Sequence, residues 1–344
     1  MKIDAILGNA TLADVPNIAR AAEKAGFDGL WSQETDHDPF LPHTLIAEHT
    51  KRLQSGTSIA VAFSRSPMNL AYSAWDLARF SGGRFVLGLG TQVKAHIERR
   101  FGMPWPRQPI RQFREMVQAI RAVWQCWQGG ERLAFRGEYY RLGLMTPFFT
   151  PAPLVGALPR IYLSGVGHSM AQLAGEVGDG FFIHPFHTAE SLRQITLPAI
   201  CTGQARSVLD GNHFERAATV FVATSQKKLE QVRKQISFYA STPSYSSVMA
   251  LHGYQENAQR LAKLAGRGKW EEMPDLIPDA FLEHVCVYGE DETSLANNIL
   301  ARYGGLVERV SLYLPMTGST ADTFNWNVFV QTIKGQAGPP AEHV

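Results

Sequence analysis

The sequence predicts an α/β protein, a (β/α)8 TIM barrel with insertions. β-rich runs alternate with helical patterns about every 25 to 29 residues in the first ninety positions. Eight such runs can be counted along the chain, and 344 residues lie within the usual length of this barrel. A doubly wound open sheet shows the same alternation, so it remains the alternative.

The first four units follow one plan. Their strands begin near Ile3, Phe27, Thr57 and Phe85. Apolar residues from Val15 to Ala25 have helical spacing, with Asp14 as the expected N-cap, Pro16 in the first turn and Gly26 just past the end. Helices are also expected over residues 45–53 and 68–80.

After Gly90 the regular interval breaks. We expect an insertion at about 91–159, with an amphipathic helix over 110–127 and a hairpin over 133–140. Strand patterns return at 161–163, 180–183, 219–222 and 310–313, and a second, helical insertion is expected at about 225–307. The chain then reads as one domain over residues 1–320, followed by a C-terminal helix and tail over 321–344.

The composition restricts the class of protein. Hydrophobic residues make up 45% of the chain, the net charge is +2, and the basic residues are scattered, so no nucleic-acid or membrane-surface partner is expected. Cys126, Cys201 and Cys286 are too far apart for a C-x-x-C pair, which is typical of a reducing compartment. The N-terminus reads as a strand rather than a signal peptide, and no apolar run approaches about 20 residues. These features predict a cytoplasmic protein.

Function in such a barrel belongs at the carboxyl ends of the strands, where the βα loops gather. After strand two, His37 could exchange a proton with a substrate while Asp36 orients it. Along strand three, Ser58, Ala60 and Ala62 are expected on one face, where small side chains would admit a flat ligand. A loop histidine and a barrel filled by alternating small and large residues are the structural alternatives.

Two glycine-containing turns follow strands four and five. The segment Gly88 to Gln92 only partly fits a dinucleotide fingerprint, because Val93 stands where the third glycine should be. Segment 164–167 leads from a strand through two glycines into a helix, whose exposed N–H groups could bind a phosphate. No H-x-H ends the first strand and no H-E-x-x-H occurs, so no catalytic metal is expected.

Taken together and in this order, these clusters resemble the bacterial luciferase-like monooxygenase superfamily, particularly its oxidoreductases that depend on the deazaflavin coenzyme F420. The matching stretches, which lie within about residues 1–320, are 25–31, Asp36-His37, 56–59, 65–67, 83–91, 164–167 and 178–182. A closer subgroup of deazaflavin oxidoreductases also shares 92–105 and 184–186, although this match implies no substrate.

The resemblance implies site residues one by one. Ser58-Ile59 matches a non-prolyl cis peptide behind the central ring of the flavin or deazaflavin, and Gly165, Val166 and Gly167 match the loop that holds the cofactor phosphate. We place Gly90, Thr91, Gln92 and Ser164 in the same cofactor site. Asp36 and His37 match, in the sugar-phosphate dehydrogenase branch of the family, a catalytic histidine and the acidic residue that orients it. That branch has a further acidic residue shortly after strand four, and its position here falls near Val93, whose side chain is apolar. The resemblance therefore does not imply a sugar phosphate as the substrate.

The expected activity is hydride transfer between F420 and a small organic substrate, with His37 as proton donor or acceptor. One alternative is an FMN-dependent monooxygenase that uses molecular oxygen, since both cofactors share the ring and phosphate sites. A second is a non-catalytic flavin-binding protein. The resemblance also implies a homodimer, formed through helices near the early strands of the barrel.

Overall fold

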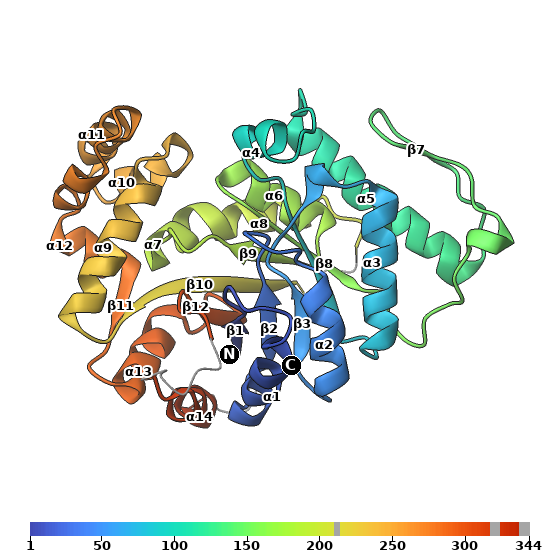
Figure 1. Ribbon diagram of the computed structural model, residues 1–344. Helices are drawn as coiled ribbons and strands as arrows, with labels where there is room; N and C mark the ends of the chain where they lie inside the picture. Colours follow the sequence, from blue (N-terminus) through green and yellow to red (C-terminus); the bar gives the residue numbers. More distant parts are fainter. Residues whose placement is uncertain (210–213, 317–323, 337–344) are drawn as a thin grey trace.

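A computed structural model describes residues 1–209, 214–316 and 324–336 of the chain. Its centre is a closed ring of eight parallel strands (Figure 1). These are β1 (Lys2–Ile6), β2 (Gly29–Ser32), β3 (Gln54–Thr57), β5 (Phe85–Gly90), β8 (Arg160–Gly165), β9 (Gly180–Ile183), β10 (Glu215–Ala223) and β12 (Arg309–Leu312). Pairing of β10 with both β9 and β12 closes the ring, so the barrel is confirmed and the open sheet is excluded.

Helices surround this ring and cover the outward faces of the strands. They are α1 (Val15–Ala25), α2 (Leu41–His49), α3 (Pro67–Phe80), α5 (Pro109–Gly129), α6 (His168–Val177), α8 (Leu197–Gln204), α13 (Glu292–Tyr303) and α14 (Trp326–Gln336). α14 packs against both α13 and α1 and thereby joins the last helix of the ring to the first (Figure 1). None of the helices in the described ranges is long and apolar enough to span a bilayer.

Local sequence signals explain where α1 begins and ends. Its apolar stripe Val15, Ile18, Ala19 and Ala22 is buried against the barrel. Pro16 lies in the first turn, and Gly26 ends the helix in the left-handed conformation, with φ 92°. Asp14 is the N-cap residue, as predicted, but its carboxylate accepts hydrogen bonds from the N–H and hydroxyl of Thr11 instead of from a helix N–H.

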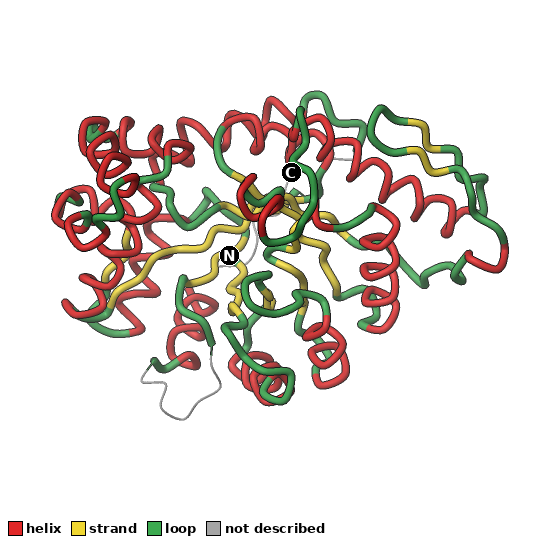
Figure 2. The backbone as a smooth tube through the Cα atoms, turned by 45° about the horizontal axis from the view of Figure 1, so that its top comes forward, coloured by secondary structure: helices red, strands yellow, loops and turns green. Residues whose placement is uncertain are grey.

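Other element boundaries differ from the sequence prediction. α2 spans Leu41–His49 rather than 45–53, because the chain must leave the helix before β3 begins at Gln54. The expected hairpin exists, but its strands are only β6 (Phe135–Arg136) and β7 (Arg141–Leu142). It projects from the side of the barrel opposite the helices α9 to α12 (Figures 1 and 2).

The segment between β10 and β12 builds a separate helical layer. It contains α9 (Gln226–Ala240), α10 (Ser246–Leu251), α11 (Gln255–Gly266) and α12 (Asp279–Val285), followed by β11 (Cys286–Tyr288). β11 adds to the outside of the barrel by pairing in parallel with β10. This layer has its own apolar core, with Ile236, Met249, Leu261 and Phe281 at its centre.

The remaining elements are short. Within the described residues they are the strand β4 (Ala60–Val61), the helices α4 (Lys94–Arg99) and α7 (Ala189–Ser191), a π-helical stretch (Leu192–Thr196) and five 3₁₀ turns (Ala62–Ser64, Pro147–Phe149, Pro243–Tyr245, Trp270–Glu272 and Pro274–Leu276). The π-helical stretch joins α7 to α8. Of the predicted C-terminal segment, residues 321–323 and 337–344 lie outside the described residues.

Two layers of side chains fill the lower part of the barrel interior. Near the amino ends of the strands, the buried Arg309 guanidinium binds both carboxylate oxygens of Asp4, at 2.8 and 2.7 Å, and contacts Glu215 at 3.2 Å. Above this charged layer lie Trp31, Val86, Tyr162, Phe182 and Ala217. The interior is therefore closed below, and any ligand has to enter from the carboxyl ends of the strands.

Candidate active site

The structure brings most of the predicted cofactor residues together. Ser58 and Ile59 follow β3, Gly90 ends β5, and Ser164 and Gly165 end β8, and these three strands are neighbours in the ring. Gly90 is directly opposite Ser164 in the strand register. A Cβ atom on Gly90 would lie 2.9 Å from the side chain of Ile59, so this glycine lets Ile59 lie across the end of β5.

The peptide bond between Ser58 and Ile59 is cis, as the resemblance implied. The expectation that Ser58, Ala60 and Ala62 share one strand face was wrong. β3 ends at Thr57, the two-residue strand β4 covers only Ala60 and Val61, and residues 62–64 form a 3₁₀ turn. The chain thus leaves the extended conformation on both sides of β4, and regular alternation does not apply.

The glycine turn after β8 has the geometry of an anion site. Gly167, at the start of α6, has φ 84° and ψ 169°, a conformation that is essentially restricted to glycine. A Cβ atom there would meet nothing within 4 Å, so the space beside the turn is open. The Ser164 hydroxyl already donates to the carbonyl of Phe182, at 2.9 Å, which leaves the N–H groups of the first turn of α6 as donors.

Gln92 has the left-handed conformation, with φ 59°, in the loop after β5. This conformation is uncommon for residues other than glycine and is frequent at ligand sites. The Gln92 side chain accepts a hydrogen bond from the N–H of Val93 at 3.0 Å, and the Thr91 hydroxyl donates to the Gln92 carbonyl at 3.2 Å. Both residues are half-buried beside the end of β5.

The predicted proton-transfer pair lies in the loop after β2. The nearest oxygen of Asp36 is 3.8 Å from Nε2 of His37, and about half of each side chain is exposed. The pKa of Asp36 is lowered chiefly by the hydroxyl of Thr35, which donates to the carboxylate at 2.8 Å, so the carboxylate is negative near neutral pH. The separation is longer than a hydrogen bond, and the catalytic role of His37 stays a prediction.

Sequence reasoning missed the two residues that anchor this loop. Glu34 is buried and forms an ion pair of 2.7 Å with Arg65, which follows β4. Arg65 also lies 3.5 Å from the carboxylate of Asp38, on the other side of His37. The only signals in the sequence were that Arg65 lies within a matched stretch and that Glu34 lies between two of them, since a separation of 31 positions shows no local pattern.

An aromatic wall lies beside the glycine turn, and its His184 and Tyr245 line the same cavity as the turn. We define it as His184 after β9, Tyr313 after β12, and Tyr239 and Tyr245 from the helical layer. The His184 ring centroid lies 4.7 Å from those of Tyr239 and Tyr245, and the hydroxyls of Tyr239 and Tyr313 are 3.0 Å apart. Tyr239 comes from α9, distant in sequence, so only the fold shows the contact.

Burial controls the charge of this wall. Desolvation lowers the pKa of His184 to about 3 and raises the pKa of Tyr245 to about 12. Both side chains are therefore neutral at pH 7. A cavity lies between the glycine turn and the wall, lined among others by Gly165, Val166, Gly167, His184 and Tyr245. Neutral imidazole and phenol groups contribute no positive charge, so an anion bound there would depend on hydrogen-bond donors such as the backbone N–H groups of the turn.

The residues present are compatible with a ring that carries a phosphate tail. The open space at Gly167 and the free N–H groups of α6 suit a phosphate. The ends of β3 and β5 bring the backbone of Ser58-Ile59 next to Gly90, with the Ile59 side chain lying across this glycine. Within residues 1–209, 214–316 and 324–336, no group of three His, Cys, Asp or Glu side chains could hold a metal ion.

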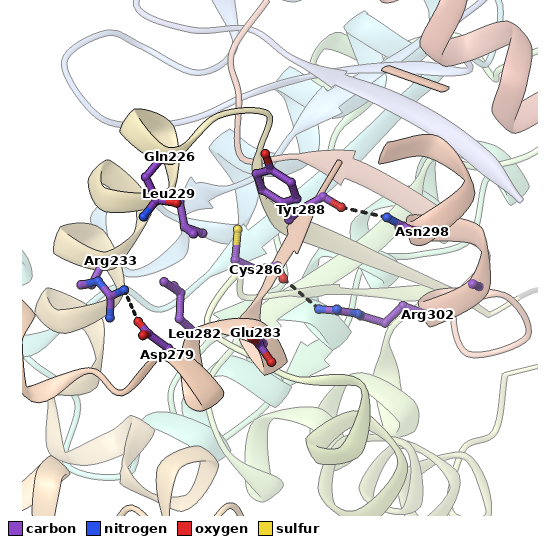
Figure 3. A pocket seen from close by; sticks show the side chains of 11 residues that line it. Gln226, Leu229, Arg233, Asp279, Leu282, Glu283, Cys286, Tyr288, Asn298 and Arg302 are labelled. Carbon is purple, nitrogen blue, oxygen red and sulfur yellow. Dashed lines mark hydrogen bonds and ion pairs between the residues drawn. The ribbon is translucent and has the colours of Figure 1, made fainter. Parts of the chain in front are cut away.

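A larger cavity, of about 950 Å³, lies on the outside of the barrel (Figure 3). α9, α12, β11 and α13 line it, and Arg233 there is paired with Asp279. Asn298 and Arg302 of α13 donate to the carbonyls of Tyr288 and Cys286, at 2.9 and 3.0 Å. None of the residues implied in cofactor binding or proton transfer lines this cavity, so it is separate from the candidate active site.

Comparison with known families gives a match over residues 2–309 to the family model described as luciferase-like monooxygenase. The chain belongs to this family. This luciferase-like chain is 45% identical over 316 residues to the uncharacterized protein Rv1360 of Mycobacterium tuberculosis, covering 90% of this chain and 92% of that protein. It is also 31% identical over 201 residues to an F420-dependent glucose-6-phosphate dehydrogenase of Intrasporangium calvum, covering 54% and 58% of the two chains.

Solved structures agree on the fold. The coenzyme F420 dependent tetrahydromethanopterin reductase of Methanopyrus kandleri superposes with a TM-score of 0.75 at 18% identity, covering 97% of this chain and 98% of the reductase. The fold and family predicted from the sequence are thus confirmed, and the chain is a luciferase-like oxidoreductase by family.

Proposed function

We propose that this protein is an F420-dependent oxidoreductase that transfers a hydride between the deazaflavin and a small organic substrate. One observation carries the proposal: the interrupted strand at Ser58-Ile59 and the glycine turn at Gly165–Gly167 lie at the ends of strands in one sector of the barrel. Relatives whose names include F420 support the choice of cofactor.

The residues of this chain would hold the cofactor by its two ends. The N–H groups at the start of α6 would bind the phosphate, with Gly167 keeping the space beside them open. The backbone of Ser58-Ile59, with Gly90 beside it, would lie against the ring. When bound, F420 supplies a carbon of its central ring that accepts or donates a hydride.

Proton transfer at the substrate would then belong to His37. In the oxidising direction its imidazole would remove the proton of a substrate hydroxyl, and in the reducing direction it would donate one. The carboxylate of Asp36, whose nearest oxygen is 3.8 Å from Nε2 of His37, would be the charged group beside this imidazole. The aromatic wall of His184, Tyr239, Tyr245 and Tyr313 would exclude water from the opposite side of the site.

A second candidate is an FMN-dependent monooxygenase that uses molecular oxygen. The description of the matching family as luciferase-like monooxygenase favours it. The candidate phosphate turn and the segment at Ser58-Ile59 would serve FMN equally well, because both cofactors carry a tricyclic ring and a phosphate.

Titration of the purified protein with F420 and with FMN, followed by absorbance and fluorescence, separates the candidates. We expect saturable binding of F420, and reduction or oxidation of bound F420 in a screen of alcohols, aldehydes and unsaturated acceptors. Binding of FMN alone, with oxygen consumption, would favour the monooxygenase. Binding of F420 with no hydride exchange against any acceptor would favour a non-catalytic flavin-binding protein.

A further inference from the structure

Glu34 is a buried carboxylate at the start of the loop that carries His37. Only 5% of its side chain is exposed. Its Oε2 atom accepts hydrogen bonds from the N–H of Val61, at 2.6 Å, and from Nη1 of Arg65, at 2.7 Å. Its own N–H donates to the carbonyl of Ile59 at 3.3 Å. Glu34 is thus bonded to the chain immediately after the Ser58-Ile59 peptide through both its backbone and its side chain.

Arg65 binds the same two segments from the other side. Besides Glu34, its guanidinium contacts the carboxylate of Asp38 at 3.5 Å and the ring of Phe40 at 5.3 Å. Asp38 in turn accepts the N–H groups of Phe40 and Leu41 at 2.8 and 3.2 Å, at the start of α2. Arg65 therefore holds the loop at a point before His37 and at a point after it.

The part of the loop between these two points has few other supports. Asp36 and His37 are about half exposed, and the Thr35 carbonyl accepts a hydrogen bond from Arg100. Removing one partner of a buried ion pair lowers the stability of the folded protein, because the remaining charge is left buried without a counter-charge or water. An arginine can bind two carboxylates at once through its planar fork, which a lysine cannot do in the same geometry.

We propose that Glu34 and Arg65 are positioning residues that fix the loop carrying His37 relative to the chain at Ser58-Ile59. The pair joins the element that would manage the proton to the element that would lie against the cofactor ring. The expected effect on cofactor binding rests on the proposed function. A change in the Glu34–Arg65 pair should alter both cofactor binding and the local order of the two segments. The pair itself contacts neither substrate nor cofactor in this role.

The test compares Glu34→Gln and Arg65→Lys with a matched pair elsewhere in the full-length chain. Arg114 of α5 and Glu176 of α6 form a two-bond ion pair, of 2.8 and 2.9 Å, on the outer helix layer. Glu176→Gln and Arg114→Lys are therefore the controls. For each protein, hydrogen–deuterium exchange is measured over residues 33–40 and 58–65, with and without F420, and F420 affinity is measured by fluorescence.

We expect Glu34→Gln and Arg65→Lys to speed exchange in both segments by at least about tenfold. F420 affinity should fall by at least about tenfold, while the control variants change either quantity less than about twofold. In the unaltered protein, F420 should protect both segments together. These results would support the positioning role, because a merely structural ion pair would lower stability without moving the dissociation constant of F420.

Three results would overturn the proposal: unchanged F420 affinity in Glu34→Gln, exchange that rises in one segment and not in the other, or equal loss of affinity in the control variants. If the unaltered protein binds neither F420 nor FMN, the proposed function fails, and so does the consequence for cofactor binding. In that case, faster hydrogen–deuterium exchange in both segments of Glu34→Gln would still support the view that the ion pair connects them. Faster exchange in one segment alone would refute it.

Discussion

Replacing Arg309 with methionine tests the charged layer at the closed end of the barrel. Arg309 is fully buried, and it makes two hydrogen bonds to Asp4, of which only 2% is exposed. The variant would leave the Asp4 carboxylate buried without its cation, whereas Glu215 keeps Lys2 at 2.6 Å. Removing one partner of a buried pair typically costs about 3–5 kcal/mol, and we expect a loss of that size at pH 7.

The pH dependence of unfolding provides a second measurement on the same layer. Burial alone would raise the pKa of Glu215, but Arg309, Lys2 and Tyr162 together lower it from 4.5 to about 2. At about 1.4 kcal/mol per pKa unit, this corresponds to about 3 kcal/mol of stability, which is present above pH 4.5 and lost as the pH falls to 2. Arg309→Met should reduce this acid-dependent loss.

Urea unfolding followed by circular dichroism, at pH 7 and at several values down to pH 3, measures both effects. Adding Asp4→Asn to Arg309→Met should recover part of the lost stability, because the stranded charge is removed. A loss below about 1 kcal/mol in Arg309→Met, or no recovery in the double variant, would refute the view that this layer depends on charge pairing.

Three further predictions concern the site and the surface. His37→Ala should lower turnover by at least about 100-fold and leave F420 affinity nearly unchanged, as measured by steady-state kinetics and fluorescence titration; equal losses in both would contradict its role in proton transfer. Gly167→Ala should weaken F420 binding at least about tenfold, because a residue with a side chain is strained at φ 84° and ψ 169°. The control is Gly130→Ala, at φ 71° on the end of α5, which should lower the stability of the protein without changing its F420 affinity. Light scattering should show a homodimer, and Phe148→Asp should dissociate it, because Phe148 is 89% exposed in the segment that packs on α3. Phe238→Asp is the control and should leave the dimer intact. A monomeric native protein would refute the predicted dimer.

The fold was predictable because its signals are local. Strand and helix patterns alternate at short intervals, and Pro16 and Gly26 mark the limits of a helix within a few residues of chain. Asp14 shows the limit of such reasoning, because a competing hydrogen bond to Thr11 determined the orientation of its carboxylate. The cis bond at Ser58-Ile59 came from family resemblance, since no periodic pattern encodes it.

The parts of the site that sequence reasoning missed depend on contacts between distant segments. Glu34 and Arg65 are 31 positions apart, and Tyr239 and Tyr313 are 74 positions apart. Each pair forms only because the barrel brings the ends of different strands and the helical layer together. Residue type alone could not have selected these side chains from the many other glutamates, arginines and tyrosines of the chain.

The outer strand β11 has a consequence for the behaviour of the protein at high concentration. A closed barrel has no free strand edge, but β11 creates one, because it pairs only with β10 among the described strands. Asn298 and Arg302 occupy its outward carbonyl groups and so block the positions at which a strand from another molecule would attach. Truncating these two side chains should therefore promote self-association of the folded protein, even though neither touches the catalytic end of the barrel.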